Sequence, residues 1–428
     1  MRRTVLSMGT IFLLTVFVVT LASVPAAAQA AEKVLHSFLG GTDGIAPSGG
    51  VVFDSAGRLY GATCQGGAHG NGVVYQMAQK SGGVWSEHVI HTFNASAGDG
   101  NCPSSSLIVD KSGNVYGTAP LGGRYSTGVV FELIAPTTGG GWGYRILHNF
   151  SNNGLDGHSP FGGLVMDAAG NLYGTTQYGP SNFFGTVFEL SPTAGGSWKE
   201  TILYSFPINS NGFMVDGAEP QGSLIFDAAG NLYGATNGGG VYGFGTVFEL
   251  SPTGSGTWTE SILHSFLNTF SADIWTLQGG VAIDKSGNLY GCTEAGGTDN
   301  DGGIFELSPA GDGTWTETIL HTFTGGTNHS KDGAVCNWET PVLDSAGNLY
   351  GVTSYGGANG AGTVWKLTAQ SGGTWAYSTI YSFKFTNGDG VNPVSTMAFD
   401  SLGNLYGSTL SGGPGGDSGN GTVFVVKP

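Results

Sequence analysis

The chain has 428 residues and a formal net charge of −16 at pH 7, and 78 of its residues are glycine. Nucleic acid is a poor partner for so acidic a protein, because binding the phosphate backbone depends on clustered Lys and Arg. A glycine content far above the usual level of about 7% indicates low complexity unless the glycines recur with a period, and here they do.

The first thirty residues have the pattern of a secretory signal peptide. Arg2 and Arg3 precede an apolar run over residues 11–22 and a small-residue stretch over 26–31, which is the order such signals follow. We expect cleavage after Ala28 or Ala30, and hence a signal peptide at 1–30 and a single domain at 31–428. No later apolar run approaches the roughly 20 residues that cross a bilayer, so we predict a secreted or periplasmic protein without a transmembrane segment.

One eight-residue phrase recurs through the rest of the chain. Its first residues are Asp54, Asp110, Asp167, Asp227, Asp284, Asp344 and Asp400, at intervals of 56 to 60 residues. A period of this kind indicates a repeat architecture. In the copy at 227–234 we expect the Asp carboxylate to accept backbone N–H groups and Gly230 to adopt positive φ, in a tight turn between two short strands.

Each repeat contains four predicted strands, which in one copy span residues 223–226, 231–236, 246–250 and 258–266. Four antiparallel strands in about 57 residues are typical of one β-propeller blade. Six fourth strands carry a Trp, which we expect to pack between neighbouring blades. These residues are Trp85, Trp142, Trp198, Trp258, Trp315 and Trp375.

The two ends of the chain favour a ring over an open solenoid, which would need capping repeats. After a third strand at 422–426 no fourth strand follows, but residues 33–38 match the fourth strand at 318–323. We therefore predict an all-β protein, a seven-bladed β-propeller closed by the N-terminal strand joining the last blade. Closure would leave no open sheet edge of the kind that aggregates.

The repeated phrase, followed by Gly-Gly and then by Gly-Thr-Val-Phe-Glu-Leu-Ser-Pro, resembles the GloVer tandem-repeat family of exported bacterial proteins. The best matches are residues 230–252 and 170–192, and the last copy departs by ending in Val425-Val-Lys. The resemblance covers nearly the whole mature chain. It implies propeller-like repeats and export, with differing C-terminal anchors in the family and no established activity.

The four cysteines are an even number in a chain expected to be exported, so we expect them to be oxidised. Cys102 and Cys336 each lie eight residues before a repeated Asp, and Cys64 and Cys292 each follow the second strand of the preceding blade. These equivalent placements predict the disulfides Cys64–Cys102 and Cys292–Cys336. The competing interpretation is four buried thiols.

Connections between strands 2 and 3 and between strand 4 and the next strand 1 lie on one face of a propeller, and the latter vary in length. Variable loops on a rigid frame are a usual place for binding. Trp275 and Trp338 interrupt the repeat there, and exposed aromatic rings suit sugar rings or apolar peptide side chains; the alternative is that they only cover long loops. The candidate ligand-binding residues are Trp275, Trp338, Glu339, Tyr178, Tyr242 and Tyr355.

We predict no catalytic residue and no metal site from the sequence. A second row of Asp residues (43, 99, 156, 216, 273, 332 and 389) is best explained by turns, although such a row could attract Ca²⁺. Five His share one fourth-strand position where Tyr204 and Tyr381 substitute, which argues against a ligand or base. The positions expected at the axis are small and neutral except Glu339.

These patterns predict a monomeric exported binding or scaffold protein without catalytic activity, whose ligand is a glycan or a protein. The alternative is a metal-assisted lyase or hydrolase with its site at the top of the propeller axis. An enzyme of that plan needs His, Asp and Glu from a few blades converging there, whereas the residues unique to single blades in this chain are largely aromatic or neutral.

Overall fold

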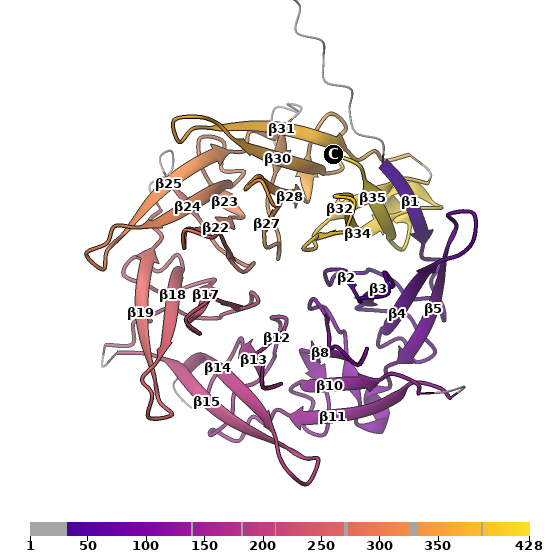
Figure 1. The fold of residues 1–428 in the computed structure, drawn as a ribbon, viewed down its shortest axis with the longest axis horizontal. Coiled ribbons are helices and arrows are strands. Elements are labelled where there is room, and N and C mark those ends of the chain that lie inside the picture. Colours follow the sequence, from indigo (N-terminus) through magenta and orange to yellow (C-terminus); the bar gives the residue numbers. More distant parts are fainter. Residues whose placement is uncertain are drawn as a thin grey trace, which may run out of the picture.

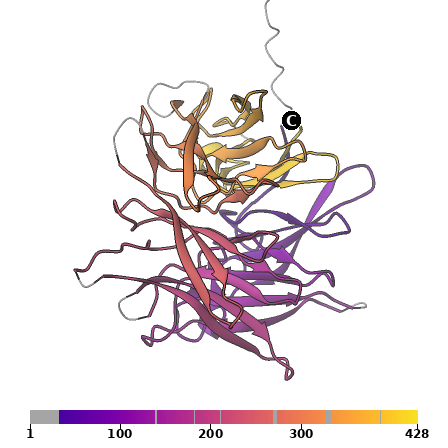
Figure 2. The same ribbon diagram turned by 60° about the vertical axis from the view of Figure 1, so that its left-hand side comes forward.

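The computed structural model describes residues 32–137, 140–180, 183–209, 211–268, 273–325, 332–386 and 388–428. Seven small antiparallel sheets are arranged as blades in a ring around a central axis (Figure 1), and Figure 2 shows the same ring obliquely. The predicted all-β, seven-bladed propeller is confirmed. The predicted signal peptide lies outside the described residues.

Each blade is a four-stranded meander, numbered from the axis outward in the first six. Blade 1 contains β2 (Val52–Phe53), β3 (Leu59–Thr63), β4 (Val73–Gln79) and β5 (Trp85–Thr92). Blade 2 contains β7 (Ile108–Val109), β8 (Val115–Ala119), β10 (Val129–Ile134) and β11 (Gly143–Asn149). Blade 3 contains β12 (Val165–Met166), β13 (Leu172–Thr176), β14 (Phe183–Pro192) and β15 (Trp198–Pro207). Blade 4 contains β16 (Ile225–Phe226), β17 (Leu232–Thr236), β18 (Thr246–Pro252) and β19 (Trp258–Ser265).

The remaining blades follow the same plan. Blade 5 contains β21 (Ala282–Ile283), β22 (Leu289–Cys292), β24 (Gly303–Pro309) and β25 (Trp315–Thr322). Blade 6 contains β27 (Val342–Leu343), β28 (Leu349–Thr353), β30 (Thr363–Ala369) and β31 (Trp375–Ser382). Blade 7 contains β33 (Ala398–Phe399), β34 (Leu405–Gly412), β35 (Thr422–Val426) and β1 (Glu32–Ser37).

Short extra pairings lie where the chain enters a blade. They join β6 (Gly100–Asn101) to β9 (Leu121–Gly122), β20 (Ile274–Trp275) to β23 (Ala295–Gly296), β26 (Gly333–Ala334) to β29 (Tyr355–Gly356), and β32 (Gly390–Pro393) to β34. Two single 3-10 turns, η1 (Ala95–Ala97) and η2 (Gly416–Ser418), complete the described elements.

Blade 7 takes its outermost strand from the opposite end of the chain. Strand β1 pairs antiparallel with β35, with Glu32 opposite Val426 and Ser37 opposite Thr422. The Phe38 N–H continues the ladder by donating to the carbonyl of Gly421 at 3.0 Å. In Figure 1 the indigo β1 lies beside the yellow β35, so blade 7 is built from both ends of the chain.

The repeated turn forms as its residues predict. Asp227 Oδ1 accepts the N–H groups of Ala229 and Asn231, both at 2.8 Å, and its Oδ2 accepts the Asn231 amide at 2.9 Å. Gly230 has φ of +90°, which a residue without Cβ adopts at little cost. The turn fixes the register of the first two strands. Tyr233, from the second strand, donates a hydrogen bond from its hydroxyl to Asp227 Oδ2.

Neighbouring blades meet through aromatic rings. In six of the seven blades a Trp at or just before the start of the fourth strand packs edge-on against the Tyr of the repeated phrase in the preceding blade, as Trp258 does against Tyr173 with ring centroids 6.3 Å apart. All six predicted Trp residues make this contact. Inside each blade a third-strand aromatic ring lies over the Gly of the same phrase, so that a Cβ on Gly234 would lie 2.5 Å from Phe248. Both roles of the phrase are therefore structural.

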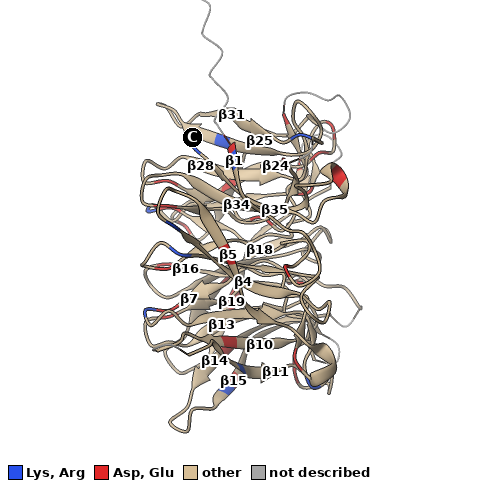
Figure 3. Ribbon diagram, turned by 90° about the vertical axis from the view of Figure 1, so that its right-hand side faces the viewer, with Lys and Arg blue, Asp and Glu red and all other residues tan. Residues whose placement is uncertain are grey.

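Both predicted disulfides, Cys64–Cys102 and Cys292–Cys336, are present. Each links the end of a second strand to the connection entering the next blade. Charged residues are sparse along the ribbon, most of which is uncharged (Figure 3). Within the described residues, no helix has the length and apolar character to span a membrane.

Candidate functional site

A cavity of about 370 Å³ lies at the mouth of the central axis. Its walls come mainly from the residues four to six positions before each repeated Asp, where the chain turns into the innermost strand. Small residues are required here because the blades almost touch. A Cβ on Gly222 would lie 2.3 Å from the carbonyl oxygen of Gly279, and one on Gly279 would lie 1.7 Å from that of Glu339. The blades thus pack closely around the axis, and the cavity lies at the mouth beside these contacts.

The walls are uncharged, and apolar surface predominates over polar surface in them. The side chains that line the cavity include hydroxyls, amides and two aromatic rings, and none of the described lining residues carries an ionisable group. The hydroxyls are those of Ser48, Ser104, Ser105, Ser106, Ser223, Thr340 and Thr396, the amides are Gln65 and Gln221, and the rings are Phe161 and Trp338. The Cys64–Cys102 disulfide forms part of one wall.

Some of these hydroxyls hold the frame and others have no partner. Ser223 Oγ accepts the N–H of Gly163, and Thr340 Oγ1 accepts that of Gly280, both at 3.0 Å across blade boundaries. By contrast, the Oγ atoms of Ser48 and Ser104 have no hydrogen-bond partner within the described part of the chain. Both oxygen atoms are buried, so they are unsatisfied groups of the frame, whereas most buried polar groups have a hydrogen-bond partner.

Trp338 lies at this mouth, in a connection that is one residue longer than the others. The interval from Asp332 to Asp344 is twelve residues instead of eleven, and Trp338 adopts φ of +50°. Its side chain lines the cavity while the residue remains 47% exposed. The sequence prediction of an exposed ring on the loop face is therefore correct for Trp338.

The corresponding prediction for Trp275 is wrong. Trp275 is only 8% exposed and belongs to the core between blades 4 and 5. Its ring lies 5.3 Å from that of Phe244, and its strand β20 is held by β23. Trp275 thus covers a long connection, which is the alternative that the sequence left open.

Glu339 reaches the axis as expected, but its carboxyl group turns into blade 6. Oε2 accepts the N–H of Val352 at 2.7 Å, and Oε1 has no hydrogen-bond partner among the described residues. The hydroxyls of Ser395 and Ser105 accept the equivalent N–H in blades 7 and 2. Burial raises the pKa of the Glu339 carboxyl well above its usual range, and the Val352 bond offsets this only in part. Glu339 is therefore a buried residue of the frame and does not line the cavity.

The three predicted tyrosines are exposed but are not among the described lining of the cavity. Tyr178, Tyr242 and Tyr355 are 39%, 51% and 47% exposed. Tyr178 lies against His158, with ring centroids 5.0 Å apart. The structure thus brings Trp338 to the axial cavity and leaves these tyrosines outside it.

The fourth-strand His or Tyr and the second row of Asp come together at every blade boundary. Sequence analysis missed the third member. In six of the seven clusters it lies two residues after the Trp of the next blade, and this constant spacing was the available signal; in the seventh it is Glu32. The seven clusters are His36, Asp43, Glu87; His91, Asp99, Tyr144; His148, Asp156, Glu200; Tyr204, Asp216, Glu260; His264, Asp273, Glu317; His321, Asp332, Tyr377; and Tyr381, Asp389, Glu32. The turn role predicted for these Asp is also present, as in Asp99, which accepts the N–H groups of Asn94 and Gly100.

Comparison with known proteins gives a family match and similar solved structures. A family model described as a Gloeobacter/Verrucomicrobia repeat matches residues 8–225 and 207–339. No curated protein matches the sequence. Similar solved structures include a protein of unknown function from Dyadobacter fermentans DSM 18053, with 13% identity, a TM-score of 0.43 and 92% and 99% of the two chains covered. Another is a luciferin-regenerating enzyme, with 12% identity, a TM-score of 0.42 and 93% and 95% covered.

Proposed function

The chain belongs to the Gloeobacter/Verrucomicrobia repeat family, and we propose that it is an exported binding protein whose axial cavity takes a small neutral carbohydrate. The observation that carries the proposal is the wall chemistry of the cavity, which combines hydroxyls and amides with two aromatic rings and no ionisable group. Sugars present hydroxyls and apolar ring faces together, and such a wall complements both. The volume of about 370 Å³ is within the range of about 300–1,000 Å³ usual for small-molecule sites.

Trp338 is the principal contact in this proposal. Its ring is half-exposed at the mouth, where one face can cover a ligand held by the hydroxyls below. The amides of Gln65 and Gln221 line the cavity and are at least partly exposed, so they are polar groups that a sugar can reach. Two disulfides support an oxidising, exported setting for such a protein.

Catalysis at the axis has less support. A metal-assisted lyase or hydrolase would need carboxylates or imidazoles converging on the cavity, and the described lining residues supply neither. The only carboxyl group at the equivalent position, that of Glu339, is buried inside blade 6 and bonded to the backbone. The wall is suited to holding a neutral molecule and not to moving protons.

The proposal is tested by calorimetric titration with a panel of neutral oligosaccharides, with uronates and aromatic peptides as comparators. We expect a neutral sugar to bind, and Trp338→Ala to weaken its binding about tenfold or more, the loss typical of a central aromatic contact. Tyr242→Ala is the matched control, because Tyr242 is similarly exposed but does not line the cavity. Preference for the uronates or peptides, or equal effects of the two substitutions, would contradict the proposal.

A further inference from the structure

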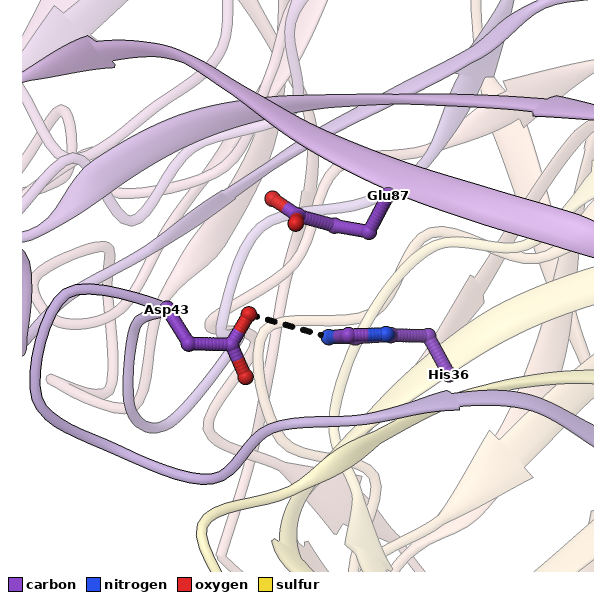
Figure 4. A group of neighbouring side chains, drawn as sticks. All are labelled: His36, Asp43 and Glu87. Carbon is purple, nitrogen blue, oxygen red and sulfur yellow. Dashed lines mark ion pairs between the residues drawn. The ribbon is translucent and has the colours of Figure 1, made fainter.

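Three of the seven blade-boundary clusters consist of one imidazole and two carboxylates, and two of these three are compact. In the clusters of His36, Asp43 and Glu87 and of His148, Asp156 and Glu200, one ligand atom from each residue lies within 4.8 Å of the others. Figure 4 shows the first cluster, in which the three side chains extend toward a common space from different segments. His36 lies on β1 of blade 7, Glu87 on β5 of blade 1, and Asp43 on the connection between them.

The distances in these two clusters exceed those of hydrogen bonds in the related clusters. His36 Nε2 lies 3.3 Å from Asp43 Oδ1, and His148 Nε2 lies 3.3 Å from Asp156 Oδ2 and 3.7 Å from Glu200 Oε2. Tetrahedral Zn²⁺ with bonds of about 2.0–2.1 Å requires ligand atoms about 3.3 Å apart. The separations are therefore close to the edges of a metal tetrahedron.

Several polar atoms at the corners of these clusters are buried and have no hydrogen-bond partner. They include His36 Nε2, Glu87 Oε1, Asp156 Oδ1 and Glu200 Oε1. Asp156 is only 8% exposed. No Lys or Arg of the described chain forms an ion pair with these carboxylates. Each cluster therefore places two carboxylates close together with no Lys or Arg partner, and this leaves their charge incompletely balanced.

Backbone N–H groups also hold the Asp carboxylates in place. Asp43 Oδ2 accepts the N–H of Leu39 at 2.7 Å, and Asp156 Oδ2 accepts that of Ser151 at 2.9 Å. Fixed orientation of a ligand by a backbone donor is a usual feature of metal sites. The backbone thus positions the Asp carboxylates beside the imidazoles.

Two other boundaries provide an internal comparison. Where the third residue is Tyr, its ring stacks on the imidazole, with centroids 4.0 Å apart for Tyr144 on His91 and 3.8 Å for Tyr377 on His321. The imidazole then bonds directly to its Asp, at 2.9 Å for Asp99 and 3.0 Å for Asp332. The distance between imidazole and Asp is therefore longer in the clusters whose third residue is Glu.

We propose that the clusters of His36, Asp43 and Glu87 and of His148, Asp156 and Glu200 are binding sites for Zn²⁺ or a similar divalent transition metal. Imidazole nitrogen with carboxylate oxygen suits such ions, whereas Ca²⁺ takes six to eight oxygen ligands. Each ion would join adjacent blades, and the first would fasten β1 to blade 1. The cluster of His264, Asp273 and Glu317 is less compact and is not included.

The test is calorimetric titration of EDTA-treated, dialysed protein with Zn²⁺ at pH 7.5, together with melting in the presence and absence of Zn²⁺. We expect two ions per chain and a higher melting temperature with Zn²⁺, because binding to the folded state alone stabilises it. Glu87→Tyr and Glu200→Tyr should each remove one ion, and the double variant should lose both ions and the thermal shift. Tyr occupies the same position in blades 2 and 6, so these substitutions follow a pattern the fold already contains.

Glu260→Tyr is the matched control, because its cluster has Tyr204 in place of His. This variant should still bind two Zn²⁺ ions per chain. If a Tyr variant fails to fold, Glu87→Gln and Glu200→Gln test the proposal instead. Each should weaken Zn²⁺ binding at its site by more than the roughly 10–100-fold cost of losing a group that only hydrogen-bonds to a metal ligand. Absence of Zn²⁺ binding to the wild type, or two ions retained by a folded double variant, would overturn the proposal.

Discussion

At the scale of single residues, two deviations from the repeat define the axial site. Trp338 stands at a repeat position where other blades have Ser, Gln, Val or, in blade 3, Phe161, and Glu339 replaces Gly or Ser at the next. The Trp338 side chain lines the cavity, and the Glu339 carboxyl group turns away from it. A difference of one position along the backbone thus separates a candidate ligand contact from a frame residue.

Substitutions at Glu339 test its assignment to the frame. Glu339→Gln keeps an acceptor for the Val352 N–H, whereas Glu339→Ala leaves that buried donor unpaired and should cost about 1–3 kcal/mol. The raised pKa means that the folded protein holds this proton more tightly than the unfolded chain. Wild-type stability from this group is therefore complete below the unfolded pKa and declines as pH rises toward the folded pKa.

Because Gln does not titrate, the stability of Glu339→Gln relative to wild type should increase between pH 5 and pH 8. Guanidinium unfolding at several pH values measures this difference. Parallel pH profiles for the two proteins would show that Glu339 is ionised in the fold.

At the scale of elements, β1 has the most consequential position, because it supplies the outer edge of blade 7. Deleting residues 33–38 should expose β35 as an unpaired edge and cause loss of monomeric folding or concentration-dependent association. Sedimentation velocity over a range of concentrations, with thermal melting, measures both effects.

The control for this deletion comes from the chain itself. Replacing residues 33–38 by the sequence of residues 318–323, which forms the same strand in blade 5, should restore the monomer and most of the melting temperature. A deleted protein that stays monomeric with unchanged melting would refute the role assigned to β1.

Elements were the level that the sequence predicted best. The strands expected at 231–236 and 246–250 correspond to β17 and β18, because turn residues and alternating apolar residues recur with the repeat. Repetition also allowed the disulfide partners to be chosen, since equivalent positions in adjacent blades must have equivalent separations.

Exposure was harder to predict where the repeat is interrupted. Trp275 and Trp338 occur in the same kind of connection, and nothing in their immediate sequence shows that β23 and Phe244 bury the first. The boundary clusters were missed for a related reason. Each combines residues from two blades that are far apart in sequence, and only the ring geometry brings them together.

At the scale of the whole molecule, the blades of the ring together form one site, the axial cavity. Every blade contributes small residues at the axis because the blades crowd there, and their hydroxyls then line a neutral cavity. The chemistry of that cavity is the basis for the function proposed above.

Filling the cavity while leaving the blades intact tests this account most directly. Ser104 lines the cavity at the repeat position where blade 3 has Phe161, and its hydroxyl has no partner. We predict that Ser104→Phe abolishes binding to an array of neutral glycans while its melting temperature remains near that of wild type. Glycan binding by the filled variant at the wild-type level would contradict the central claim that the axial cavity is the ligand site.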